Sequence, residues 1–245
     1  MPATPAWPPK SLPRLFVRAA LGPGAVVELD IGQANYLGNV MRLKPGDHVL
    51  LFDGASGEWI ARIAEAGRKR MTLAVEDRTR EQEHGTNLWL AFAPVKRAQT
   101  DWLVEKATEL GIARLLPVTT QRTIVERVRL ERLQAIAIEA AEQCNRTSLP
   151  AIDEPQSLDA FMNAHAGRTL YFADEGGGEP AASAFKPGAA TILTGPEGGF
   201  TEEERAAIRA APHAIAVSLG PRILRAETAA LAAITTYMAL AGDWR

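Results

Sequence analysis

The chain has 245 residues, of which 47% are hydrophobic and 23% are charged, and its formal net charge is −2. This composition supports one large or two modest globular domains and excludes a disordered or strongly basic protein. No apolar run approaches the length of a membrane span, and the Pro-rich residues 1–13 lack the apolar core of a signal peptide.

Cysteine and histidine usage argues against disulfides and metal. Cys144 is the single cysteine, so the chain cannot form an internal disulfide or a Cys-based zinc site. The four histidines are scattered without ligand spacing, and we therefore expect no metal. A reducing, cytoplasmic setting is the natural expectation.

The first part of the chain favours a small β-barrel with a mildly basic charge. Residues 1–80 carry 11 Lys and Arg against 8 Asp and Glu, a margin too small to decide whether this part meets phosphate. One helix is expected over 33–41, a turn over 43–47 and a hairpin loop over 53–57. Short strands are expected at 15–17, 25–29, 48–52, 58–63 and 71–75.

The polar residues 79–87 are a plausible linker, and the pattern changes after them. Apolar strands now alternate with helical patterns, which predicts a largely parallel sheet with helices on both faces. Thr201 and Glu204 form the sequence signature of a capping box. Strands are expected at 88–93, 113–118, 169–173, 190–194 and 214–219, and helices at 100–110, 127–144, 158–165, 202–210 and 227–241.

The most unusual segment is Leu193-Thr194-Gly195-Pro196-Glu197-Gly198-Gly199-Phe200, which joins a buried-looking strand to a capped helix. Ligands bind at the carboxyl ends of strands in α/β sheets, and glycines allow close backbone approach. A tight connection without a ligand explains the spacing about equally well. The acid-rich glycine run Asp174–Pro180 also follows a strand, and a flexible loop at a cofactor's rim is the favoured interpretation.

A second unusual segment again joins a strand to a helix: Leu219-Gly220-Pro221-Arg222-Ile223-Leu224-Arg225-Ala226-Glu227-Thr228-Ala229. Core packing explains its two arginines poorly. The helix dipole would favour Glu227 in the first turn without any further role. A third group of polar residues could line a cleft, although each residue alone is more typical of a solvated helix: Lys96, Lys106, Glu109, Arg122, Glu139, Gln143 and Arg146, the last three forming a stripe on one predicted helix.

These segments resemble the ribosomal RNA small subunit methyltransferase E family, which belongs to the knotted SPOUT class. The resemblance rests on 195–200 and 219–229, supported by 40–47, 106–111 and 139–146, and it extends from Arg14 to the end of the chain. Tyr36 departs from the family pattern, which often has His at this place, and this puts any contact there in doubt.

The resemblance implies an α/β protein (α+β overall), with a PUA-like RNA-binding β-barrel over 1–80 and a SPOUT methyltransferase domain with a trefoil knot over 81–245. It implies a homodimer, S-adenosylmethionine as cofactor, and methylation of N3 of a uridine in 16S ribosomal RNA of the small subunit. The expected cofactor-binding residues are Leu193, Thr194, Gly195, Pro196, Glu197, Gly198, Gly199, Leu219, Gly220, Arg222, Ile223 and Leu224.

Methyl transfer to uracil N3 requires loss of a proton, and a carboxylate within hydrogen-bond reach could accept it. Glu227 is the first candidate for this base, and Arg225 could stabilise negative charge on the uracil. The residues expected to contact RNA are Arg14, Arg18, Arg42, Lys96, Arg122, Glu139, Gln143 and Arg146.

Alternatives from other classes remain open on the sequence alone. They are a non-catalytic RNA-binding protein, a different transferase or nucleotide-binding enzyme that uses the same Gly-rich turn, and a knotted methyltransferase that modifies another RNA nucleotide or a ribose hydroxyl. The apolar last helix is buried either in a dimer interface, which the family resemblance slightly favours, or on its own sheet.

Overall fold

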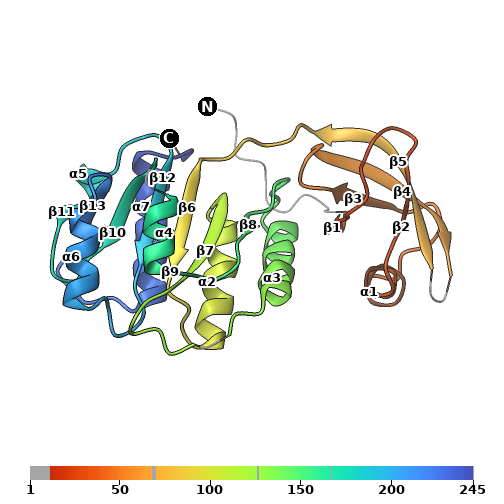
Figure 1. Cartoon of the computed structure of the whole chain (residues 1–245). Helices are drawn as coiled ribbons and strands as arrows, with labels where there is room; N and C mark the ends of the chain where they lie inside the picture. Colours follow the sequence, from red (N-terminus) through yellow and green to blue (C-terminus); the bar gives the residue numbers. More distant parts are fainter. Residues whose placement is uncertain (1–11, 68–69, 126, 166, 245) are drawn as a thin grey trace. The chain divides into compact units, whose positions relative to one another are not determined.

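The computed structural model describes residues 12–67, 70–125, 127–165 and 167–244 (Figure 1). The chain divides into two compact units. One unit runs to His84 and also includes Asn145–Ser148, and the other contains the rest of the chain from Gly85 onward. The chain thus returns to the first unit at Asn145–Ser148, a segment that the predicted division at residue 80 does not include.

The first unit is a five-stranded sheet that forms a half-barrel. Its strands pair in the order β1 (Arg14–Phe16), β3 (His48–Phe52), β4 (Glu58–Ala66), β5 (Met71–Arg80), β2 (Val26–Glu28), and only β1 and β3 run parallel. Apolar side chains that alternate along these strands, such as Val49 and Leu51 on β3, form one buried core. The five predicted strands are confirmed, but β5 continues to Arg80, so residues 79 and 80 belong to a strand and not to a linker.

The helix predicted at 33–41 divides into two parts. Asp30 is the N-cap residue of helix α1 (Ile31–Asn35), and its carboxylate accepts a hydrogen bond from the Gln33 N–H at 2.8 Å. The helix continues as the π-helix η1 (Tyr36–Val40), and Arg42, two residues after it, adopts a positive φ of 60°. Tyr36, the residue that departs from the family pattern, is 39% exposed here.

The second unit is an eight-stranded sheet in which every pair of neighbours runs parallel. Its main path is β11 (Glu179–Pro180), β13 (Ala214–Ser218), β10 (Thr169–Ala173), β12 (Ala190–Thr194), β6 (Leu88–Phe92), β7 (Arg114–Thr119), β8 (Ala151–Ile152), and β9 (Gln156–Ser157) pairs with β7. The predicted parallel α/β sheet is confirmed. Strand β10 lies between β12 and β13, both of which follow it in the sequence.

Helices cover both faces of this sheet (Figure 1). Alternation along β6 sends Leu88, Leu90 and Phe92 into a core with α2 (Arg97–Glu109), α3 (Leu130–Gln143), α5 (Ala181–Ala184) and α7 (Ala226–Leu240). Ala91 faces the opposite core, which contains residues of α4 (Leu158–Ala164) and α6 (Glu202–Ala210). The predicted capping box at the start of α6 is confirmed by reciprocal hydrogen bonds between Thr201 and Glu204.

The last helix is buried on its own sheet. Ala230, Ala233, Ile234, Tyr237 and Met238 of α7 are all fully buried in the core of the second unit. The apolar composition of α7 is therefore accounted for without a partner chain, and the homodimer stays a prediction. The trefoil knot likewise stays a prediction.

No helix among the described residues combines the length and the hydropathy that crossing a membrane would require.

Candidate active site

Three loops meet in one cavity at the carboxyl edge of the parallel sheet. They follow β10, β12 and β13, which are neighbours in the sheet and run parallel, so that their carboxyl ends lie side by side. The cavity has a volume of about 310 Å³, at the lower end of the range for small-molecule sites. The two segments singled out in the sequence, 193–200 and 219–227, thus come together as expected.

Most of the predicted cofactor-binding residues line this cavity. Those that do are Thr194, Gly195, Pro196, Glu197, Gly199, Leu219, Gly220, Arg222, Ile223 and Leu224. Leu193 and Gly198 do not line it. Leu193 is fully buried in the core beneath the α4 and α6 face, because alternation along β12 directs its side chain there. Gly198 instead faces the side chain of Arg122.

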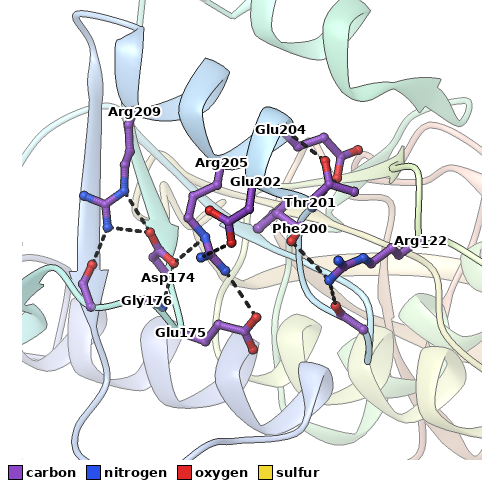
Figure 2. Close-up of polar contacts among 12 residues, drawn as sticks. Arg122, Asp174, Glu175, Gly176, Phe200, Thr201, Glu202, Glu204, Arg205 and Arg209 are labelled. Atoms are coloured by element: carbon purple, nitrogen blue, oxygen red, sulfur yellow. Dashed lines mark hydrogen bonds and ion pairs between the residues drawn. The ribbon is translucent and has the colours of Figure 1, made fainter.

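The loop after β12 is held in place by a long-range contact. The Arg122 guanidinium donates hydrogen bonds to the carbonyls of Gly198 at 2.6 Å and of Phe200 at 3.4 Å (Figure 2). Gly199 has a positive φ of 66°, and a Cβ built there would lie 2.6 Å from the Glu175 carboxylate. The sequence placed Arg122 among RNA-binding residues, whereas the structure places it against the cavity loop.

The loop after β10 supplies the third wall and was expected only at a rim. Asp174 and Glu175 line the cavity together with Gly177. The Asp174 side chain is 1% exposed and forms ion pairs with Arg205 at 3.1 Å and Arg209 at 2.6 Å, both from α6 (Figure 2). Its carboxylate also accepts a hydrogen bond from the Gly176 N–H at 2.8 Å, so that it fixes the turn of the loop.

Sequence reasoning missed several residues of the cavity. Asp174 and Glu175 directly follow an apolar strand, as the other two loops do, and this signal indicated a loop at the rim of a cofactor site but not a wall of the cavity. Arg205 lies on a predicted helix with nothing in the sequence to point it toward the cavity. The lining residues not predicted are Ala173, Asp174, Glu175, Gly177, Phe200, Arg205, Val217, Ser218, Pro221, Ala226 and Ala229.

Carboxylates outnumber guanidiniums in the lining. Asp174 is neutralised by its two arginines, and Glu175 pairs with Arg205 at 3.2 Å but keeps a side chain that is 48% exposed. Glu197 is exposed at the cavity and forms no hydrogen bond or ion pair within the described part of the chain. Exposed carboxylates favour a bound cation over a phosphate.

The predicted catalytic pair lies at the start of α7, beside the cavity rather than in its lining. Arg225 is the exposed N-cap residue, and Glu227 is 8% exposed in the first turn. Ala226 and Ala229, three residues apart and therefore on one face of α7, do line the cavity, whereas Glu227 lies on another side of this first turn. Among the described residues, the Glu227 carboxylate forms no hydrogen bond or ion pair.

Two predicted RNA-binding arginines are buried within the first unit. Arg14 pairs with Glu58 at 2.6 Å, and both side chains are 7% exposed. Arg146 contacts Glu83 at 3.5 Å and donates to the Ser148 hydroxyl at 3.0 Å, with a side chain 10% exposed. These pairings leave the two guanidiniums little surface for a phosphate.

The predicted stripe of Glu139, Gln143 and Arg146 on one helix is wrong in its last member. Helix α3 ends at Gln143, and Asn145 then adopts a left-handed φ of 63°, which carries Arg146 off the helix. Glu139 and Gln143 are exposed on α3. The remaining predicted contacts are exposed too: Arg18 and Arg42 in the first unit, and Lys96 at the N-cap of α2.

In the described part of the chain, no group of three or more His, Cys, Asp or Glu side chains gathers as a metal site would require.

Comparison with known protein families identifies both parts of the chain. Residues 82–238 match the model of an RNA methyltransferase domain, and residues 29–76 match that of an RNA methyltransferase PUA domain. A ribosomal RNA small subunit methyltransferase E from Rickettsia conorii is 30% identical over 226 residues, covering 90% of this chain and 93% of the relative. The chain belongs to the ribosomal RNA small subunit methyltransferase E family.

Further relatives agree with this membership. The methyltransferase E of Synechocystis is 34% identical, with 88% of this chain and 74% of the relative covered. A crystal structure of the methyltransferase E from Neisseria gonorrhoeae bound to S-adenosyl methionine superposes with a TM-score of 0.89 at 29% identity, covering 96% of this chain and all of the other. The PUA-like fold of the first unit and the α/β methyltransferase fold of the second are those of the family.

Proposed function

We propose that this protein transfers a methyl group from S-adenosylmethionine to N3 of a uridine in 16S ribosomal RNA. The observation that carries the proposal is the cavity between the loops after β10, β12 and β13 in a chain of the methyltransferase E family. The relative from Neisseria gonorrhoeae binds this donor in a fold with a TM-score of 0.89 to the present one. A cytoplasmic location, the small ribosomal subunit as substrate and a homodimer are parts of the same proposal.

The residues of the cavity fit the donor in charge and in shape. S-adenosylmethionine supplies an electrophilic methyl group on a positively charged sulfur. Glu175 and Glu197 place exposed carboxylates at the cavity, which favour that positive charge. Gly199 and Gly220, with φ of 66° and 108°, bring backbone rather than side chains to the cavity, so that the loops can hydrogen bond to a closely seated ligand.

The chain would contribute to the reaction mainly through positioning and a proton acceptor. Glu227 accepts the N3 proton of the uracil, and its burial at 8% exposure keeps water from competing for the carboxylate. Arg225, exposed at the N-cap of α7, places positive charge where the uracil oxygens become more negative. Arg122 holds the loop of Gly198 against the sheet, which fixes the wall of the cavity.

Nucleoside analysis tests the proposed reaction directly. Small subunits or 16S RNA from cells that lack this gene are incubated with the purified protein and S-adenosylmethionine, then digested and analysed by mass spectrometry. The expected product is 3-methyluridine at a single site. A methyl group on a ribose, on another base or on no nucleoside at all would reject the assignment.

The variant Glu227→Gln tests the proton acceptor. Because general-base catalysis contributes about 10²–10⁴-fold, turnover at saturating donor should fall by at least about 100-fold. The matched control is Glu203→Gln, an exposed acidic residue in the first turn of α6 that does not line the cavity. Turnover of Glu227→Gln equal to that of the control would remove Glu227 from the reaction and leave it a helix-terminal charge.

A further inference from the structure

A second cavity, of about 190 Å³, opens in the α/β unit where β6 leads into α2. Four arginines line it: Arg97 and Arg132 from α2 and α3, and Arg127 and Arg129 from the segment before α3. Asp101 is the one carboxylate among its described lining residues. Neither the candidate active site nor the predicted RNA contacts include any of these arginines.

Among the described residues, the charge of this cavity is only partly neutralised. Asp101 receives three hydrogen bonds from Arg132, at 2.6–3.0 Å, and lies 3.9 Å from Arg97. Arg127 and Arg129 are exposed, and their guanidiniums form no hydrogen bond or ion pair with the residues that the structure describes. Guanidiniums gathered in this way repel one another, so the cavity favours an anion that carries more than one acceptor oxygen.

The floor of the cavity is apolar. Val95, Val125, Val128 and Leu133 lie between the arginines. A cavity that combines an apolar floor with a guanidinium rim suits a nucleotide unit, whose sugar and base contact the floor while its phosphate pairs with the rim.

The basic cavity lies at the same edge of the sheet as the candidate active site. The Ala93 N–H, just after β6, donates a hydrogen bond to the Thr194 carbonyl at the end of β12, at 3.0 Å. Val95 then lines the basic cavity, and Gly195 lines the active-site cavity. Residues 122–125 join the two sites, because Arg122 binds the active-site loop while Val125 lines the basic cavity.

We infer that this basic cavity binds a phosphodiester of the RNA substrate close to the nucleotide that is methylated. The inference rests on the proposed function for the identity of the substrate. RNA that presents a base to the active site must pass over the neighbouring strand ends, and the arginine-lined cavity lies there. The active-site cavity, lined by Glu175 and Glu197, would then hold the cationic methyl donor, and the arginine-lined cavity would hold the anionic RNA.

The double variant Arg127→Gln, Arg129→Gln tests the inference in the full-length protein. Removal of one phosphate-binding cation reduces the slope of log affinity against log salt by about 0.7 for single-stranded RNA. The fall in affinity for a 16S fragment between about 50 mM and about 200 mM salt should therefore be about sevenfold smaller than in the unmodified protein. Arg127→Lys, Arg129→Lys keeps both charges and should retain most of the salt dependence.

Lys186→Gln is the matched control, since Lys186 is an exposed cation of the same unit that lines neither cavity. Donor binding measured by calorimetry should be unchanged in every variant, which separates this inference from the proposed function. If the salt slope of the double variant equals that of the control, the inference is wrong even when 3-methyluridine is formed. Binding of a free nucleotide such as ATP that depends on these arginines, with RNA binding unaffected, would also overturn it.

Discussion

Asp174 connects the loop after β10 to α6, and the variant Asp174→Asn should destabilise the α/β unit strongly. Its carboxylate is 1% exposed and is the common partner of Arg205 and Arg209. Removing one partner of a buried pair costs about 3–5 kcal/mol, because the other charge stays buried without compensation. Arg205, 17% exposed, keeps ion pairs with Glu175 at 3.2 Å and Glu202 at 3.1 Å, and Arg209, 43% exposed, can turn to solvent. The lower end of that range, about 3 kcal/mol, therefore applies.

A loss of about 3 kcal/mol corresponds to a fall of about 6–12 °C in the melting temperature of a domain of this size. Urea unfolding followed by tryptophan fluorescence, together with calorimetry, measures both quantities. The matched control is Asp153→Asn, which breaks a pair of the same kind with Arg114 at 2.8 Å. That pair is 38% and 23% exposed, and its loss should cost no more than about 1 kcal/mol. Equal destabilisation by the two substitutions would refute the argument from burial.

Two further predictions concern the candidate active-site cavity and the stability of the protein in acid. Gly199→Ala places a Cβ 2.6 Å from the Glu175 carboxylate, at a φ of 66°. Calorimetry should therefore find the affinity for the donor weakened by about tenfold or more. Gly85→Ala is the control: its Cβ meets nothing within 4 Å, and this variant should bind the donor as the unmodified protein does. Burial raises the pKa of Asp53, but hydrogen bonds from the Ala55 and Ser56 N–H groups and the Ser56 hydroxyl outweigh it and lower the pKa below 3.8. Asp53 therefore stabilises the fold above about pH 4 and loses this effect as the pH falls through its lowered pKa. In Asp53→Asn, unfolding midpoints between about pH 5 and about pH 3 should fall less than in the unmodified protein, and parallel profiles would contradict this assignment.

The sequence predicted best those helices and strands whose residue pattern is compatible with only one local structure. Apolar alternation located β3, and the capping signature at Thr201 located the start of α6. Short elements escaped prediction because their partners are distant in the chain: β11 consists of Glu179 and Pro180 alone and exists through its pairing with β13. The burial of Arg14 depends in the same way on Glu58, a residue of another strand.

The candidate site could be predicted loop by loop but not as a whole. The two loops after β12 and β13 were predicted to hold the cofactor, whereas the loop of Asp174 was expected only at the rim, because its role depends on the order of the strands. Chain order gives no indication that β10 lies between β12 and β13. The basic cavity was missed for a related reason, since Arg97 and Arg129 are separated by β7 in the sequence and each alone is typical of a solvated surface.

The position of β10 between two later strands also has a consequence for synthesis of the protein. Residues 219–224 form one wall of the cavity and follow β12 in the chain, so a nascent chain that extends only as far as β12 lacks that wall. If the cavity holds the methyl donor as proposed, a chain truncated before residue 219 should not bind it, however well its earlier strands have folded.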